Sequence, residues 1–297
     1  MYHQPVLLHE AVEGLAVRPQ GVYVDVTYGG GGHSKLILSK LGDGHLIAFD
    51  TDEDALKNVI LDERLKVVNS NFKFLQNFLQ LYDFEKVDGI LADLGISSHQ
   101  LDSPERGFAA RLDSRIDLRM DRRKDLDAVQ ILNKYDEARL AEILRDYAEL
   151  PNSGRLAALI CKHRREKKIV STTDLVSSIK SAIPPGAENR FLARVFQALR
   201  IEINDELGAL RELMIQGRDA LKPGGRLVVI TYHSLEDRLV KNFMRSGNFE
   251  GKIEEDFFGN RTTVFTLITK KPVTPSQEEL VRNPRSRSAK LRIAEKN

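Results

Sequence analysis

The fold of this 297-residue chain is decided by residues 22–34, which read VYVDVTYGGGGHS. An apolar run rich in β-branched residues ends in Asp25, four consecutive glycines follow, and a helical pattern begins at Lys35. This order predicts a strand, a tight turn and the start of a helix. Glycine lets the backbone approach a ligand closely, and a helix N-terminus offers unpaired N–H groups. The segment therefore predicts a doubly wound α/β sheet that holds a nucleotide-containing cofactor.

Two further segments narrow the choice of cofactor. A second predicted strand ends in Asp50, where a carboxylate accepts hydrogen bonds from ribose hydroxyls in sites for NAD and for S-adenosylmethionine (SAM). The dinucleotide pattern G-x-G-x-x-G is incomplete, because Ser34 stands where its third glycine belongs. Residues 221–230 read LKPGGRLVVI and resemble the turn before the fifth strand of class I SAM-dependent methyltransferases. Together these features favour SAM over NAD.

Composition limits the class of protein. Hydrophobic residues make up 41% and charged residues 30% of the chain, as in soluble globular proteins. No apolar run is long enough for a membrane span, and residues 1–5 lack the basic start and apolar core of a signal peptide. The single cysteine, Cys161, excludes an internal disulfide. We therefore expect a cytoplasmic protein without a membrane anchor.

The net charge of +2 conceals an asymmetry. Residues 282–297 hold six basic residues against one acidic residue, Glu295, so this tail carries +5 and the rest of the chain −3. Concentrated positive charge favours a polyanionic partner, and a solvated tail is the plainer alternative. We take Arg285 and Arg287 as candidate substrate contacts.

Strands and helices alternate along the first third of the chain. Strands are predicted at 22–26, 45–50, 66–69 and 87–93, with helices between them, such as those at 52–60 and 74–82. Such alternation predicts a parallel sheet with crossover helices. After residue 95 the patterns are helical. The last predicted strands lie at 226–231 and in a hairpin of 252–255 with 262–268.

We interpret the helical stretch as an inserted domain. Residues 104–195 form this all-helical domain, to which we assign substrate recognition, and residues 1–103 and 196–297 form the cofactor-binding domain. Apolar positions at helical spacing predict one long helix over 191–221 at the joint between the two.

Eight segments, in order along nearly the whole chain, carry a resemblance to a known family. They include GGHS at 31–34, DLGISS at 93–98, YHSLEDR at 232–238 and NPRSRSAKLR at 283–292. The others lie at 6–12, 105–108, 117–121 and 196–207. The chain resembles the bacterial 16S ribosomal RNA cytosine-N4 methyltransferases, the RsmH or MraW family. Departures at 115–117, 145–170 and 193–195 fall in or beside the inserted domain, where they affect the expected substrate contacts.

The resemblance implies a class I methyltransferase fold with a SAM site. The residues that it assigns to the cofactor are Gly31, Gly32, His33, Asp50, Phe72, Asp93 and Gln100. The glycine turn would line the methionine part through backbone N–H groups, Asp50 would bind the ribose and Phe72 would cover the adenine. Asp93 would pair with the methionine ammonium or receive a proton from the target, and Gln100 would add an amide contact.

These assignments have structural alternatives. Asp50 also suits a helix N-cap, and a phenylalanine such as Phe72 more often belongs to the core. Ser97 and His233 are candidates for facing the target base, although residues 234–237 form a capping box that suggests a structural role for His233. We assign no catalytic residue. Seven histidines and one cysteine show no ligand spacing, so we expect no metal.

Basic residues of the inserted domain are a further candidate contact for RNA. They are Arg111, Arg115, Arg119, Arg122 and Arg123. Three aspartates interleave with them, so a salt-bridged helix surface is the alternative. These are Asp113, Asp117 and Asp121.

The leading hypothesis is an rRNA methyltransferase that modifies the exocyclic N4 of a cytidine in 16S rRNA of the small ribosomal subunit. A DNA amino methyltransferase is disfavoured by the absence of an Asp-Pro-Pro-Tyr-like motif. A non-catalytic ribosome-assembly factor is disfavoured by the intact glycine turn, Asp50 and Asp93. An NAD dehydrogenase is a more distant alternative. The sequence leaves the oligomeric state open, and a homodimer is compatible with it.

Overall fold

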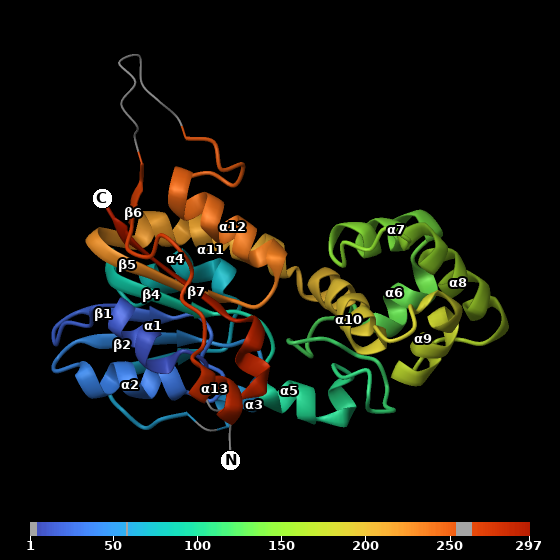
Figure 1. The fold of residues 1–297 in the computed structure, drawn as a ribbon. Helices are drawn as coiled ribbons and strands as arrows, with labels where there is room; N and C mark the ends of the chain where they lie inside the picture. The colour runs from blue at the N-terminus through green and yellow to red at the C-terminus, as the bar shows by residue number, and fades with distance from the viewer. Residues whose placement is uncertain (1–4, 58, 254–262) are drawn as a thin grey trace. The chain divides into compact units, whose positions relative to one another are not determined.

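The chain divides into two compact units (Figure 1). The computed structural model describes residues 5–57, 59–253 and 263–297. Unit 1 comprises Met1–Gly95 together with Leu207–Asn297, and unit 2 comprises Ile96–Glu206. The insert that we expected at 104–195 falls inside unit 2, which extends further in both directions.

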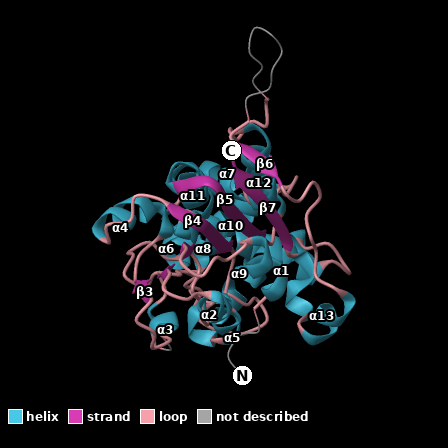
Figure 2. Ribbon diagram, turned by 90° about the vertical axis from the view of Figure 1, so that its left-hand side faces the viewer, coloured by secondary structure: helices cyan, strands magenta, loops and turns pink. Residues whose placement is uncertain are grey.

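Unit 1 is built on a seven-stranded sheet. The strands are β1 Val22–Asp25, β2 His45–Phe49, β3 Leu65–Val68, β4 Val87–Asp93, β5 Leu221–Thr231, β6 Phe265–Leu267 and β7 Lys290–Lys296. Their order is β3-β2-β1-β4-β5-β7-β6, and Figure 2 shows β4, β5, β7 and β6 as neighbours. The first five run parallel, and β7 pairs antiparallel with both β5 and β6. The order reverses between β1 and β4, which is the switch point of a doubly wound fold, so the predicted fold class is confirmed.

Helices cover both faces of this sheet (Figure 1). They are α1 Leu8–Gly14, α2 Gly32–Lys40, α3 Glu53–Leu56, α4 Leu75–Leu81, α11 Glu206–Ala220, α12 Ser234–Ser246 and α13 Gln277–Arg282, with the 3-10 turns η1 Phe72–Phe74 and η4 Pro284–Ser288. Side chains alternate along a strand, so Val228 faces the core beneath α1 and α2, whereas Val229 faces the core beneath α4, α11 and α12. Burial on both faces explains the continuous apolar runs of the central strands.

Three expectations for unit 1 differ from the structure. The helix expected at 52–60 is confined to α3, and residue 58 lies outside the described residues. The Pro-Gly-Gly turn lies within β5, where Gly224 has φ 76° and the register with β4 shifts. Of the hairpin strand expected at 252–255, residues 252 and 253 are not in a strand and 254 and 255 lie outside the described residues. The expected partner segment contains β6, which pairs with β7.

The basic tail is partly built into the sheet. β7 lies between β5 and β6, and its residues Leu291 and Ala294 are fully buried. Arg292 is only 8% exposed, and its Nε donates to Asp237 Oδ1 at 2.7 Å. The charge of Arg292 is therefore structural, whereas Arg285 and Arg287 are exposed on η4.

Unit 2 is helical and has its own apolar core. Its helices are α5 Ser98–Asp102, α6 Ala128–Lys134, α7 Glu137–Asp146, α8 Ser153–Glu166, α9 Thr172–Ile179 and α10 Glu188–Asn204, with the 3-10 turns η2 Pro104–Arg106 and η3 Lys180–Ala182. Side chains at helical spacing, such as Leu140, Ile143 and Leu144 of α7, line the core. In neither unit does the described part of the chain contain a helix long and apolar enough to cross a membrane.

The long helix expected at 191–221 is two helices. α10 ends at Asn204, α11 begins at Glu206, and Asp205 between them has φ 54°. Aspartate tolerates this left-handed conformation better than most residues. The Asn204 side chain donates to the carbonyl oxygens of Arg200 and Leu118, at 2.9 and 2.8 Å, which fixes the end of α10. The apolar periodicity continues across the break and therefore did not reveal it.

Candidate active site at the carboxyl ends of the strands

The carboxyl ends of four neighbouring parallel strands carry polar side chains. Asp25 is the last residue of β1, Asp50 follows β2, Asp93 is the last residue of β4, and Tyr232 follows β5. Parallel strands present their carboxyl ends at one edge of the sheet, so these side chains share that edge of unit 1. In doubly wound folds this edge, at the switch point, is where ligands bind.

The glycine turn after β1 has the backbone geometry that its sequence requires. Gly29 and Gly31 have φ of 52° and 72°, in the left-handed region that favours glycine. A Cβ on Gly31 would lie 2.7 Å from the Tyr28 hydroxyl, so a larger residue would displace that side chain. The Gly31 N–H donates to the Tyr28 carbonyl, and the first bond of α2 runs from Lys35 N–H to Gly31 O. The amides of Gly32 and His33 thus precede the hydrogen-bond ladder of α2, at its positive end.

Asp50 anchors the glycine turn. Its Oδ2 accepts from the Gly29 N–H at 2.8 Å, and its Oδ1 accepts from the Asp52 N–H at 2.8 Å. The N-cap of α3 is Asp52, which accepts from the Asp54 N–H at 3.1 Å, so the alternative role of Asp50 as that cap is wrong. Burial raises the pKa of Asp50 to about 6 against the lowering effect of the two amide hydrogen bonds.

Asp25 is fully buried and links the strand to α2. Its Oδ2 accepts from the Ser34 hydroxyl at 2.7 Å, and its Oδ1 accepts from the Thr27 N–H at 3.1 Å. The Thr27 hydroxyl oxygen in turn accepts from the Asp93 N–H at 2.7 Å. Burial raises the pKa of Asp25, and the hydrogen bonds from Ser34 and Thr27 only partly offset this.

Asp93 lies between Tyr232 and His33. The Tyr232 hydroxyl donates to Asp93 Oδ1 at 2.7 Å, and His33 Nδ1 lies 3.9 Å from Asp93 Oδ2. The other ring nitrogen of His33, Nε2, lies 3.2 Å from the Val6 carbonyl oxygen. Burial raises the pKa of Asp93 to about 6, and the positive charge of His33 and the hydrogen bond from Tyr232 oppose that rise.

These three carboxylates share an electrostatic feature. Among residues 5–57, 59–253 and 263–297, none of Asp25, Asp50 and Asp93 forms an ion pair with a lysine or an arginine. Buried carboxylates without such a partner resist ionisation, which is why the pKa values rise. These carboxylates attract a cation and accept hydrogen bonds from hydroxyl groups. SAM is cationic and carries hydroxyl groups, so the residues fit SAM.

The remaining predicted cofactor residues lie in different surroundings. Phe72 begins η1 after β3 and packs, half-buried, against the core beneath α4. Gln100 belongs to unit 2, where Ser97 Oγ accepts from the Gln100 N–H at 3.2 Å and Gln100 Oε1 accepts from the Ser97 N–H at 3.1 Å. This reciprocal pair caps α5. The structure therefore gathers Gly31, Gly32, His33, Asp50 and Asp93 in unit 1, and it gives Ser97 and Gln100 a capping role in unit 2.

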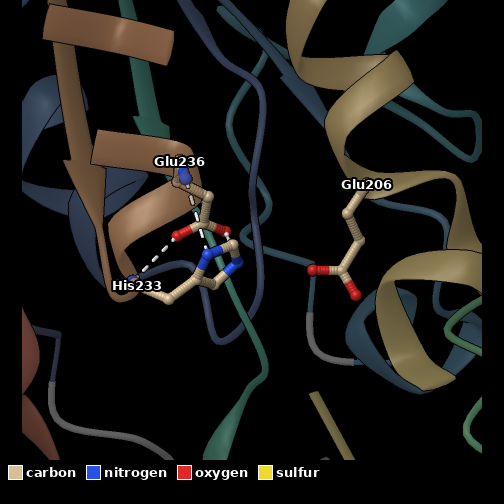
Figure 3. A group of neighbouring side chains, drawn as sticks. All are labelled: Glu206, His233 and Glu236. Atoms are coloured by element: carbon tan, nitrogen blue, oxygen red, sulfur yellow. Dashed lines mark hydrogen bonds and ion pairs between the residues drawn. The ribbon is translucent and has the colours of Figure 1, made fainter. Parts of the chain in front are cut away.

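The capping pattern suggested a structural role for His233, and the structure agrees. The N-cap is residue 233, one position before the Ser234 that the pattern indicated. His233 itself is the N-cap of α12, and its Nδ1 accepts from the Glu236 N–H at 3.4 Å (Figure 3). Glu236 Oε2 accepts from the N–H groups of Tyr232 and His233, at 2.9 and 3.3 Å. Glu206, also drawn in Figure 3, belongs to unit 2, where its carboxylate accepts from Arg200 at 2.7 and 2.8 Å.

Most of the interleaved arginines of unit 2 are paired with acids. Arg119 Nε donates to Asp117 Oδ1 at 2.7 Å, Arg123 Nε to Asp121 Oδ1 at 2.8 Å, and Arg115 Nη2 to Asp127 Oδ2 at 2.6 Å. The salt-bridged alternative therefore describes this segment better than an RNA clamp does. The segment between η2 and α6 contains no helix, so the helical part of that alternative is wrong.

Tyr232 and Thr27 were missed as site residues. Their signal in the sequence is position alone, since Tyr232 directly follows the apolar run of β5 and Thr27 follows Asp25 by two residues. No pattern of residue types distinguishes a tyrosine that reaches a neighbouring strand end from one in the core.

Comparison with known proteins shows the family of this chain. The model of the MraW methylase family matches residues 1–297. Ribosomal RNA small subunit methyltransferase H of Phocaeicola vulgatus is 56% identical over 297 residues, which cover 100% of this chain and 98% of that protein. The protein of the same name from Bacteroides thetaiotaomicron is 55% identical over 296 residues, covering 99% and 97%. A solved rRNA methylase from Streptococcus thermophilus covers 100% of this chain and 98% of its own, at 14% identity and a TM-score of 0.44, a likeness too slight to add to these. This chain therefore belongs to the MraW methylase family, as its motifs predict, and is a methyltransferase.

Proposed function

We propose that this enzyme transfers the methyl group of SAM to the exocyclic N4 of a cytidine in 16S rRNA of the small ribosomal subunit. SAM is the methyl donor, and ribosomal RNA of the small subunit is the substrate that the names of the relatives give. The observation that carries the proposal is the set of carboxylates at the strand ends beside a glycine turn. With such a substrate we propose a cytoplasmic location.

We assign the cofactor contacts residue by residue. Asp50 would accept hydrogen bonds from the ribose hydroxyls, since each of its oxygens accepts one backbone N–H and retains a further acceptor site. Asp93 would pair with the methionine ammonium. The amides of Gly32 and His33, at the positive end of α2, suit the methionine carboxylate. Phe72 would cover the adenine.

Bound SAM would supply an electrophilic methyl group on its sulfonium, the neutral thioether would be the leaving group, and the methylated amine would lose its extra proton to water or a weak base. The protein then has to hold the target amine in line with that methyl group, and positioning of this kind supplies much of the rate. The lone pair of N4 is delocalised into the cytosine ring, so an acceptor near its hydrogens would localise it. Ser97 and His233, which the sequence offers for this role, are the N-caps of α5 and α12.

The choice of N4 over cytosine C5 has a structural argument. Methylation at C5 normally requires a cysteine nucleophile. Cys161 is the only cysteine of the chain, and it is 5% exposed within the core of unit 2, where burial raises its pKa. A neutral, buried thiol is a poor nucleophile. N4 attack needs no such residue.

The test is methyl transfer to undermethylated small subunits with labelled SAM, followed by nucleoside analysis. We expect label in N4-methylcytidine. Label in 5-methylcytidine or in a ribose 2′-O-methyl nucleoside would contradict the proposal, and transfer to duplex DNA but not to subunits would favour a DNA amino methyltransferase. A protein that binds SAM and small subunits without any transfer would instead be a non-catalytic assembly factor. The Asp93→Asn variant serves as the control for adventitious transfer.

A further inference from the structure

Hydrogen bonds fix both the hydroxyl and the backbone N–H of Tyr232. Asp93 pairs with Ile230 in the register of β4 and β5. Tyr232 lies two residues after Ile230, and its side chain reaches the end of β4. Its hydroxyl donates to Asp93 Oδ1 at 2.7 Å, and its backbone N–H donates to Glu236 Oε2 at 2.9 Å. A Cβ on Gly95 would lie 3.1 Å from Cδ2 of the Tyr232 ring, so the ring packs directly against the backbone there. The side chain therefore has little freedom to rotate.

The second oxygen of Asp93 lies toward the glycine turn. Oδ2 is 3.9 Å from Nδ1 of His33, the second residue of α2, directly after Gly31 and Gly32. The Asp93 backbone is tied as well, because its N–H donates to the Thr27 hydroxyl. One carboxylate oxygen is thus fixed by Tyr232, and the other is left on the side where the cofactor would bind.

We propose that Tyr232 is a positioning residue for the methyl donor. Its hydroxyl fixes Asp93 Oδ1, so that Oδ2 is directed at the methionine ammonium of SAM. Tyr232 acts through Asp93 and does not contact SAM itself. The inference rests on the proposed function, since it takes SAM as the ligand of this edge of the sheet.

The surroundings of Asp93 support this role. The charged or titratable groups that face it are His33 on α2, Asp25 on β1, Glu236 on α12 and Tyr232 itself. Burial and the nearby Asp93 raise the pKa of Tyr232 well above 10, so the hydroxyl keeps its proton and remains a donor. A hydrogen bond to the ionised carboxylate favours ionisation, and two of the other neighbours, Asp25 and Glu236, oppose it. Loss of the hydroxyl should therefore raise the pKa of Asp93 above about 6.

The test compares two tyrosine-to-phenylalanine variants. Tyr232→Phe removes the bond to Asp93. Tyr23→Phe is the matched control, because the Tyr23 hydroxyl also accepts and donates hydrogen bonds inside unit 1, with Arg18 N–H at 2.7 Å and Ala16 O at 3.4 Å. These contacts lie before β1, at the opposite end of the strand from Asp25.

The readout is the affinity for two ligands over a range of pH. By calorimetry we expect Tyr232→Phe to bind SAM about tenfold more weakly at neutral pH. As the pH is lowered, we also expect the variant to lose SAM binding at a higher pH than the wild type does. 5′-Methylthioadenosine lacks the methionine amine and carboxylate, so its affinity should be unchanged. Tyr23→Phe should match the wild type with both ligands.

The possible results separate the inference from the proposed function. Equal weakening for SAM and 5′-methylthioadenosine, or an unchanged pH profile, would show a merely structural role for Tyr232 and overturn the inference. If SAM binding depends on Tyr232 as expected but the wild type methylates no small subunit, the inference stands and the proposed substrate is wrong. A further check is Tyr232→Phe in the Asp93→Asn background, where the second substitution should have no effect on SAM affinity. An undiminished additional loss there would contradict coupling through Asp93.

Discussion

The acids at the strand ends of unit 1 and the paired acids of unit 2 are arranged in opposite ways. In unit 2 a hydrogen bond from Arg123 lowers the pKa of Asp121. Burial alone would raise the pKa of Asp174, but Lys167 and backbone amides outweigh it and lower that pKa to about 2. At the strand ends of unit 1, burial prevails and raises the pKa values of Asp50 and Asp93 to about 6.

The difference shows what each set of charges does. A carboxylate whose neighbouring arginine neutralises it belongs to the folded structure and has little field left for a ligand. A buried carboxylate that no lysine or arginine neutralises lowers the stability of the fold. A protein retains such a carboxylate where a ligand completes the charge balance. The comparison thus assigns ligand binding to the strand-end acids of unit 1 and structural pairing to the arginine- and lysine-paired acids of unit 2, which resemble Asp62 and Asp237 elsewhere in unit 1.

The largest effect should come from Asp93→Asn. We expect about a hundredfold or greater loss of SAM affinity, because the methionine ammonium would lose a buried charged partner. Above pH 6 the variant should be at least as stable as the wild type, since it lacks a carboxylate that is costly to ionise. Calorimetry and thermal unfolding measure the two quantities. A stable variant with unchanged SAM affinity would contradict the role of Asp93.

Asp50→Ala should weaken SAM binding by about ten- to a hundredfold, the worth of hydrogen bonds from hydroxyls to a charged acceptor. Asp52→Ala is the matched control, because this neighbouring aspartate caps α3. The control should lower stability by about 1 kcal/mol and leave SAM affinity nearly unchanged. If both variants lose SAM equally, Asp50 has no specific role at the ribose.

SAM affinity should fall about tenfold per carboxylate between pH 7 and pH 5. The pKa values of Asp50 and Asp93 in the folded protein, about 6, lie above the ordinary 3.8. These groups therefore favour folding at low pH, and that contribution is lost as pH rises through about 6. The acids of unit 2 with lowered pKa values contribute stability that is lost only as pH falls below 3.8. The protein should stay folded at pH 5 while it releases SAM, which titration with circular dichroism in parallel would check; unfolding at that pH would break the comparison.

The double variant Arg285→Glu with Arg287→Glu should reduce methylation of small subunits several-fold at physiological salt, with a weaker salt dependence than the wild type. SAM affinity should be unchanged. Arg292→Glu is the contrasting variant, because Arg292 is buried beside Asp237 and its reversal should destabilise unit 1. Methylation rates equal to the wild type across a salt series would exclude Arg285 and Arg287 as RNA contacts.

The sequence predicted the sheet and the positions of its acids because those depend on local patterns. Residues 22–34 contain the strand, the turn and the helix start together, and each acid stands at a fixed place relative to an apolar run. The contact between Tyr232 and Asp93 joins residues far apart in the chain, and it depends on the register of β4 and β5. No single-sequence pattern encodes that register.

The roles of the charged residues were harder to predict from the sequence than the positions of the buried apolar residues. The tail looked like one basic arm, but residues 290–296 form strand β7, in which Arg292 is a buried partner of Asp237 on α12. Asp117 and Arg119 looked like members of a mixed surface, and only the folded turn shows which acid each arginine contacts. Similarly, the break at Asp205 depends on contacts of Asn204 with Leu118, a residue distant in sequence.

The smallest effect on SAM binding should come from Asp117→Asn. Asp117 is 7% exposed, and its two oxygens accept from Arg119 Nε and Nη2 at 2.7 and 2.8 Å. Loss of this bidentate pair leaves a partly buried arginine without its counter-charge, which should lower the free energy of unfolding by about 1–3 kcal/mol. Circular dichroism during chemical denaturation is suited to this measurement because unit 2 is helical. SAM affinity at a temperature where the variant remains folded should equal that of the wild type, since the charge of Asp117 is already neutralised within unit 2. If Asp117→Asn instead weakened SAM binding as much as Asp50→Ala, the division between ligand-binding strand-end acids of unit 1 and structural paired acids of unit 2 would be wrong.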